Sequence, residues 1–175
     1  MILSDVRLSF PDLFVARAYE DQPAKFSAVF LIEPGSENDK KIEAEILRVA
    51  KAKWGEKWQA KLKAITGNNM KYCYRPVGEK DYAGYEGLKF IKASNLSRPT
   101  VIDRDKTPLT REDGKPYSGC YVNASIDVFV NSKDGISASL KGVQFCRDGD
   151  AFTGGGVASP DDFDDLAVSD AHDFA

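Results

Sequence analysis

Hydrophobic and polar residues alternate near the start of the chain. The apolar positions of this extended segment are Ile2, Val6, Leu8 and Phe10. The period of two predicts a half-buried strand, which Pro11 is expected to end. A second extended segment, residues 25–33, is apolar on both faces, as a central strand of a sheet would be.

The alternation is clearest near the end of the chain, in residues 121–130 and 135–146, with Asp134-Gly135 between them as a turn. The apolar face of the first segment consists of Val122, Ala124, Ile126, Val128 and Val130. Phe129 is expected on the opposite face. On the returning segment, the residues expected opposite Leu140 are Lys141, Phe145 and Arg147. These two segments predict an antiparallel hairpin.

Apolar residues between the two strand-like regions recur with helical spacing. They are Ile42, Ile46, Val49, Ala50, Trp54, Trp58, Leu62 and Ile65. Ser36, with Asp39 three residues later, resembles an N-terminal capping box. Gly55 is expected to divide this amphipathic helix, and Gly67 to end it. Because the two tryptophans lie on the apolar side, we interpret them as core residues.

Residues 68–118 are irregular and rich in Gly, Tyr, Lys and Pro, with short strands expected at 71–77 and 88–95. One helical region and several strands with long polar connections do not fit alternating β–α–β units. They predict a β-rich α+β protein with a modified OB-fold, a Greek-key β-barrel whose strand face and loops bind oligonucleotides. We expect this domain to span residues 1–158 and a disordered acidic C-terminal tail to follow at residues 159–175.

Charge is distributed unevenly along the 175 residues, which carry a net charge of -3. Residues 161–175 contain six Asp and no Lys or Arg, whereas residues 1–160 contain 21 acidic and 24 basic residues. A basic body joined to an acidic tail indicates a polyanionic partner for the body. Solvated charge on a helix and on lysine-rich loops is the alternative that composition leaves open.

The three cysteines lack the spacing of a zinc site or a disulfide framework. The sequence also lacks an apolar run of membrane-spanning length and the pattern of a secretory leader. We therefore predict a cytoplasmic protein with reduced thiols that does not contact membranes.

One segment resembles a catalytic motif. Asp103, Asp105 and Thr107 have the DxDxT spacing of haloacid-dehalogenase-type phosphatases, in which the first Asp is the nucleophile. That motif needs an apolar parallel strand before it, but Arg98-Pro99 stands just upstream. The one histidine, His172, lies in the tail and cannot build a catalytic dyad or a histidine metal site. We predict that the protein is not an enzyme and holds no metal or cofactor, with a phosphatase as a remote alternative.

Cations and aromatic residues are interleaved in the middle of the chain, as binding of single-stranded nucleic acid requires. On a strand, Tyr72 and Tyr74 share a face, and Phe90 and Lys92 share a face opposite Ile91. The residues predicted to bind DNA are Lys71, Tyr72, Tyr74, Arg75, Tyr85, Lys89, Phe90, Lys92 and Arg98. The alternative is that these aromatic residues cover the rim of a barrel.

Several segments, in this order, resemble those of a family of bacteriophage single-stranded DNA-binding proteins. They are residues 8–14 (LSFPDLF), 87–95 (GLKFIKASN), 98–103 (RPTVID), 119–131 (GCYVNASIDVFVN) and 135–156 (GISASLKGVQFCRDGDAFTGGG). The resemblance covers most of the chain and implies a modified OB-fold that coats single-stranded DNA during phage replication or recombination in the bacterial cytoplasm. It does not identify the residues that contact DNA.

The tail is expected to compete with DNA for a basic groove as a tethered polyanion, and to bind replication or recombination proteins once released. Similarity to T7-type phage proteins implies the same role, although they end in Phe and here Ala175 follows Phe174. The predicted partner-binding residues are Asp161, Asp162, Phe163, Asp164, Asp165, Asp170, Asp173 and Phe174. An RNA-binding module, a protein-interaction adaptor and a merely solubilising tail remain alternatives, and the sequence leaves open whether the protein forms a homodimer.

Overall fold

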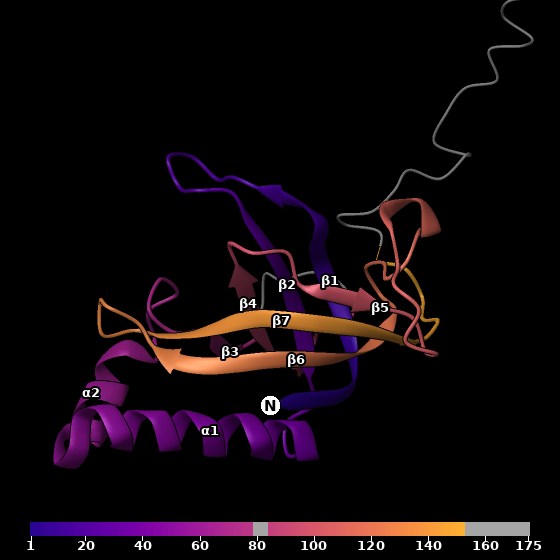
Figure 1. The fold of residues 1–175 in the computed structure, drawn as a ribbon. Helices are drawn as coiled ribbons and strands as arrows, with labels where there is room; N and C mark the ends of the chain where they lie inside the picture. Colours follow the sequence, from indigo (N-terminus) through magenta and orange to yellow (C-terminus); the bar gives the residue numbers. More distant parts are fainter. Residues whose placement is uncertain (79–83, 153–175) are drawn as a thin grey trace, which may run out of the picture.

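The structure, a computed structural model, describes residues 1–78 and 84–152. Within these ranges one sheet has the strand order β3-β4-β2-β1-β6-β7-β5, and β4 also pairs in parallel with β7. The strands are β1 (Ile2–Arg17), β2 (Lys25–Ile32), β3 (Tyr74–Pro76), β4 (Lys89–Asn95), β5 (Thr100–Ile102), β6 (Tyr121–Val130) and β7 (Ile136–Arg147). The β4–β7 pairing closes β1, β2, β4, β7 and β6 into a five-stranded barrel, which confirms the predicted modified OB-fold (Figure 1).

The helical region consists of α1 (Glu37–Trp54), a short 3₁₀ turn and α2 (Trp58–Ile65). As predicted, Gly55 separates the two helices, and its positive φ of 55° explains why glycine stands there. Helix α2 ends at Ile65, two residues before Gly67. Neither helix is long and apolar enough to cross a membrane, a finding that covers the described residues alone.

Helix α1 begins at the predicted cap, with one difference. The hydroxyl of Ser36 accepts a hydrogen bond from the Asp39 N–H at 3.2 Å. The Asp39 carboxylate, however, accepts from the Gly35 N–H at 2.8 Å instead of the Ser36 N–H. The reciprocal half of the capping box is therefore displaced by one residue.

Helix α1 lies across one end of the barrel and packs against β6 (Figure 1). Its buried apolar residues are Ile42, Ile46 and Ala50, which lie on one face of the helix. Trp54 and Trp58 are partly buried against the same core, as the sequence predicted. The helix therefore covers this end of the barrel and does not cover the outer faces of the strands.

Strand β1 is longer than predicted, because Pro11 does not end it. The β1–β2 register shifts between Ser9 and Asp12, so Pro11 lies in an irregularity where no ladder hydrogen bond is required of it. A second shift, on the β6 side of β1, lies between Leu3 and Val6. The two irregularities change which residues face inwards, and the expectation that Ile2 and Phe10 share a face with Val6 and Leu8 is wrong: Ile2 and Phe10 are 51% and 41% exposed, whereas Val6 and Leu8 are buried.

The β6–β7 hairpin forms as predicted, with one correction on the returning strand. Phe129 is exposed on the outer face. Ser125 pairs with Gly142 but Ile126 pairs with Leu140, so Lys141 is an extra residue in a bulge. Beyond the bulge the alternation reverses, and Phe145 points into the core with only 6% exposure, contrary to expectation.

The β1–β2 hairpin continues past the barrel to the pair Arg17 and Lys25. This extension, residues 14–26, rises from the barrel on the side opposite α1 (Figure 1). We call it the β1–β2 arm. In an OB-fold the connection between the first two strands borders the face that binds oligonucleotides.

Candidate nucleic-acid interface

The outer face of β2, β4 and β3 combines apolar, aromatic and cationic side chains. Leu31, Phe90 and Arg75 are neighbours across the three strands; Leu31 is buried with 5% exposure, and the other two are half-buried. The guanidinium carbon of Arg75 lies 4.8 Å from the centre of the Phe90 ring, in a cation–π contact. Lys92 is exposed on the same face, while Ile91 points into the core with no exposure. The predicted division of β4 into two faces is confirmed.

The β1–β2 arm borders this outer face. The Lys92 ammonium lies 5.8 Å from the centre of the Tyr19 ring. Arg98 donates a hydrogen bond to the Phe14 carbonyl at 3.1 Å, and its guanidinium lies 5.8 Å from the centre of the Phe26 ring. The sequence reasoning missed Tyr19 and Phe26, although the position of the arm between the first two strands of an OB-fold could have indicated them.

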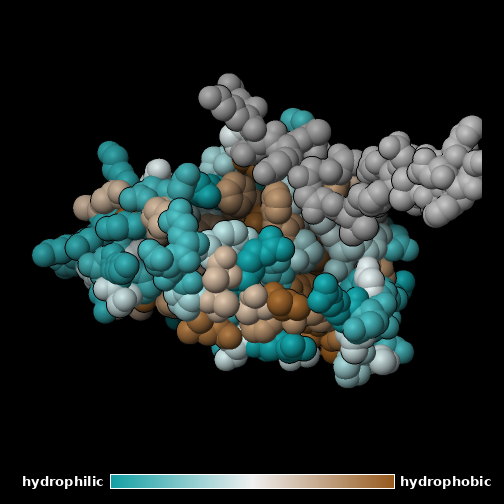
Figure 2. Space-filling model, turned by 90° about the horizontal axis from the view of Figure 1, so that it is seen from above, coloured by the Kyte–Doolittle hydropathy of each residue, from teal (hydrophilic) through white to brown (hydrophobic). Residues whose placement is uncertain are grey.

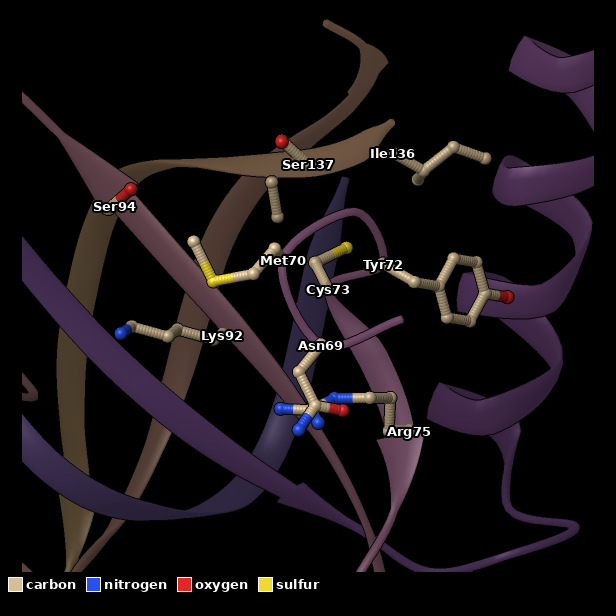
Figure 3. A pocket seen from close by; sticks show the side chains of 10 residues that line it. Asn69, Met70, Tyr72, Cys73, Arg75, Lys92, Ser94, Ile136 and Ser137 are labelled. Atoms are coloured by element: carbon tan, nitrogen blue, oxygen red, sulfur yellow. The ribbon is translucent and has the colours of Figure 1, made fainter. Parts of the chain in front are cut away.

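A shallow cleft lies on the same face, between β4, the start of β7 and the segment before β3 (Figure 3). Its lining residues are Asn69, Met70, Tyr72, Cys73, Arg75, Lys92, Ser94, Ile136, Ser137 and Ala138. The Met70 side chain projects into this space and is 90% exposed. The Tyr72 ring points away from the cleft, towards the helices. The cleft therefore offers cations at its sides and an exposed thioether between them.

The cations of this face are not neutralised by the surrounding protein. Among residues 1–78 and 84–152, Lys71, Arg75, Lys92 and Arg98 form no ion pair with a carboxylate. The Nε atom of Arg75 is covered and has no hydrogen-bond partner in the described part of the chain. The face thus retains positive charge and hydrogen-bond donors that an anionic ligand could use.

Tyr72 and Tyr74 share a face, as the strand period predicted, but it is the inner face. Tyr74 pairs with Ile91 across β3 and β4, and both side chains point into the core. The exposed fractions of Tyr72 and Tyr74 are 9% and 3%, so neither ring offers a surface on which a base could stack. The expectation of an open tyrosine platform is corrected by this burial.

Lys89 also lies on the inner face, where it joins a polar network beneath α1. Its ammonium contacts the carboxylates of Asp39 at 2.9 Å and Glu43 at 3.2 Å, and the Tyr74 hydroxyl donates to Asp39 at 2.5 Å. Burial would raise the pKa of Asp39, but the hydrogen bonds from Tyr74, Gly35 and Lys89 outweigh it and lower the pKa below its ordinary value. Burial, followed by the Asp39 carboxylate, raises the pKa of Tyr74. Lys89 and Tyr74 therefore fasten the helix to the barrel.

Tyr85 is covered as well, with 5% exposure. Its hydroxyl is hydrogen-bonded to Ser9 on β1, and its ring packs edge-on against Phe152 with the ring centres 4.9 Å apart. The Arg7 guanidinium lies 4.1 Å from the centre of the same Phe152 ring. This cluster holds residue 152, where the described part of the chain ends, against β1.

The acidic tail predicted to bind partners, residues 161–174, lies outside the described residues. The DxDxT segment follows β5 as a surface turn, in which Asp103 and Thr107 are joined by a backbone hydrogen bond of 2.8 Å. The Asp103 carboxylate forms an ion pair with Lys115 at 3.0 Å, and Asp105 accepts from the Thr107 N–H at 3.0 Å. These carboxylates therefore stabilise a loop.

Comparison with known proteins identifies the family. A family model described as Enterobacter phage Enc34, ssDNA-binding protein, matches residues 1–175. A protein of Acyrthosiphon pisum secondary endosymbiont phage 1, named putative protein p50, is 49% identical over 178 residues, covering 98% of this chain and 96% of its own.

Two solved structures of the single-stranded DNA-binding protein of bacteriophage Enc34 have similar folds. One, in complex with single-stranded DNA, matches with a TM-score of 0.71 and 23% identity over 86% of this chain and 88% of its own. The other, a C-terminal truncation, matches with a TM-score of 0.70 and 25% identity over 86% and 87%. The chain belongs to the Enc34 family of phage single-stranded DNA-binding proteins, which are not enzymes.

Proposed function

We propose that this protein binds single-stranded DNA, without reading its sequence, across the outer face of β2, β4 and β3. The arm borders one side of this path and the cleft around Met70 the other. The ligand class follows from membership of a phage single-stranded DNA-binding family. The observation that carries the location is a face with half-buried Phe90 and exposed Tyr19 rings, whose cations have no carboxylate partner among the described residues.

The residues of the proposed path divide into two roles. Phe90 and Tyr19 offer rings for stacking, which contributes about 1–3 kcal/mol per base and tolerates any sequence. Lys71, Arg75, Lys92 and Arg98 are suited to phosphates, because each carries charge without a carboxylate partner in the described ranges. Tyr72, Tyr74, Tyr85 and Lys89 are left out of the path because their side chains are occupied within the protein.

Fluorescence anisotropy of a labelled oligothymidylate, titrated with the full chain over a salt series, tests this proposal. Affinity should fall with salt, with a slope near -0.7 in log units for each phosphate contacted. Competition by unlabelled DNA and RNA of the same length separates DNA binding from the RNA-binding alternative. The absence of binding at low salt would instead favour the adaptor.

We further propose that the acidic tail competes with DNA for this path and, when displaced, binds proteins of phage replication or recombination in the host cytoplasm. Six residues, 153–158, separate the tail from Phe152, which Arg7 and Tyr85 hold against the barrel. A polyanion tethered at that point has a high effective concentration near the cations of the path.

A variant that ends at Pro160 tests the role of the tail separately from DNA binding by the proposed path. Removal of six Asp should tighten binding to oligothymidylate, most strongly at low salt where the tail's charge is least screened. A control variant keeps the full length but replaces the six Asp by Asn. If this control behaves like the full chain, the competition is not electrostatic; if truncation leaves affinity unchanged, the tail does not compete.

A further inference from the structure

A group of exposed lysines extends from Lys71, one of the cations of the proposed path, to α2 and the β6–β7 turn. Lys57 precedes α2, Lys61 is on α2, Lys133 is in the β6–β7 turn and Lys71 lies between α2 and β3; all four are exposed. We call these four residues the lysine patch. In Figure 2 hydrophilic side chains gather at the left end, where Figure 1 places α2 and the β6–β7 turn.

Backbone contacts hold the lysine patch beside the cleft. The Lys71 carbonyl accepts a hydrogen bond from the Ile136 N–H at 2.8 Å, and Ile136 itself lines the cleft. Gly135 packs so closely that a Cβ atom there would lie 2.9 Å from the Lys71 carbonyl oxygen. Asp134, in the same turn, lies 3.9 Å from the Lys61 ammonium. The cleft, the turn and α2 are therefore joined by direct contacts.

The fold does not require this concentration of charge. Helix α2 packs through Trp58, Leu62 and Ile65, and its sequence contains no acidic residue. Lys57 and Lys61 are four residues apart, a spacing at which like charges destabilise a helix slightly. Within the described ranges the one ion pair of the patch is the exposed contact of Lys61 with Asp134, and such pairs contribute little. Positive charge kept at this spacing suits a polyanionic ligand.

We infer that the lysine patch is a second phosphate-binding site, which takes up the part of a DNA strand that leaves the cleft past Met70. This inference rests on the proposed function. The strand would pass the exposed Met70 side chain and Lys71, then follow the β6–β7 turn to the flank of α2. The patch offers charge without a free aromatic ring, so it would hold the sugar–phosphate chain and leave the bases unstacked. The length of DNA covered by one protein would then exceed what the barrel face alone accommodates.

The test compares oligothymidylates of increasing length, from about 4 to about 30 nucleotides, a series that brackets the site size of an OB-fold. The variant is Lys57→Gln with Lys61→Gln in the full chain. The matched control is Lys40→Gln with Lys63→Gln, which removes the same charge from α1 and from the other flank of α2. All three proteins are compared by thermal unfolding, so that a loss of fold is not mistaken for a loss of contact.

For long oligonucleotides, the variant should show a salt slope shallower by about 1.4, the value for two lost phosphate contacts. Its affinity for the shortest oligonucleotides should match that of the unaltered protein and of the control. An unchanged slope at every length would overturn the inference while leaving DNA binding by the barrel intact. An equal loss at all lengths would also overturn it, because α2 would then belong to the main path. If the unaltered protein binds no oligonucleotide, the proposed function fails first.

Discussion

Lys89 and Lys92 are three residues apart on β4, yet the structure gives them opposite surroundings. The Lys89 side chain lies on the inner face and contacts the carboxylates of Asp39 and Glu43. The Lys92 side chain lies on the outer face, near the Tyr19 ring, with no carboxylate partner in the described part of the chain. Lys89 therefore links β4 to α1 through ion pairs, whereas the Lys92 ammonium remains available to a ligand.

The aromatic residues of β3 and β4 repeat this contrast. Tyr74 is buried and donates its hydroxyl to Asp39, whereas Phe90 is half-buried on the outer face under the Arg75 guanidinium. A ring beside a cation is therefore not in itself a sign of DNA binding. The two regions differ in whether a carboxylate of the protein already forms an ion pair with the cation, as Asp39 does with Lys89 beside Tyr74.

The largest expected effect is on the helix side. Asp39→Ala would leave the Tyr74 hydroxyl, the Gly35 N–H and the Lys89 ammonium without their shared acceptor. Breaking such a network should lower the free energy of unfolding by about 3 kcal/mol, as measured by urea denaturation. Glu37→Ala, on the exposed face of the same helix turn, should change it by no more than about 0.5 kcal/mol. Equal losses in both variants would mean that the network does not stabilise the fold.

On the outer face, Phe90→Ala should weaken binding to oligothymidylate by about 2 kcal/mol, the contribution of one stacked base. Phe90→Tyr keeps the ring and should retain most of the affinity, as measured by anisotropy. If Phe90→Ala instead lowers the thermal midpoint strongly and leaves affinity unchanged, Phe90 is a packing residue like Tyr74.

Lowering the pH should weaken the Asp39 network beneath α1 before it affects the outer face of β2, β4 and β3. Burial alone would raise the pKa of Asp39, but its three hydrogen-bonding partners lower it, so its contribution to stability is present above the ordinary carboxyl pKa of about 3.9. That contribution is lost as the pH falls through the lower pKa of the folded protein, at up to about 1.4 kcal/mol per pH unit. Urea denaturation over this acid range should show a shallower pH dependence for Asp39→Asn than for the unaltered protein. Parallel profiles would contradict the assignment.

The smallest effect concerns single charges. Lys92→Gln should make the salt slope of DNA binding shallower by about 0.7, the value for one phosphate, with little change in stability. Lys89→Gln should do the reverse, lowering stability without changing the slope. Lys40→Gln on α1 is the control for both. The same slope change in Lys89→Gln and Lys92→Gln would remove the distinction between the two faces.

Local signals in the sequence were sufficient for the elements that depend on near neighbours. The cap at Ser36, the break at Gly55 and the β6–β7 hairpin follow from side-chain chemistry and periodicity within a few residues. Phe90 and Lys92 were assigned to the outer face correctly, because the period of two is regular along β4.

Features that depend on an extra residue or on a distant partner could not be predicted in this way. The bulge at Lys141 reverses the alternation, so Phe145 was assigned to the wrong face. The inward direction of Tyr74 depends on its pairing with Ile91, and its hydroxyl partner Asp39 is 35 residues away along the chain. Such pairings are set by closure of the barrel, which no local window of sequence contains.

Photo-crosslinking tests the central claim most directly, because it reports which rings touch bases. An oligothymidylate carrying 5-iodouracil would be bound to the full chain, irradiated, and the crosslinked peptides identified by mass spectrometry. We expect crosslinks at Phe90 and at Tyr19 of the arm, all removed by unlabelled competitor DNA. Crosslinks at Tyr72 or Tyr74 with none at Phe90 would contradict the account, because DNA would then contact the face that the structure buries beneath the helices.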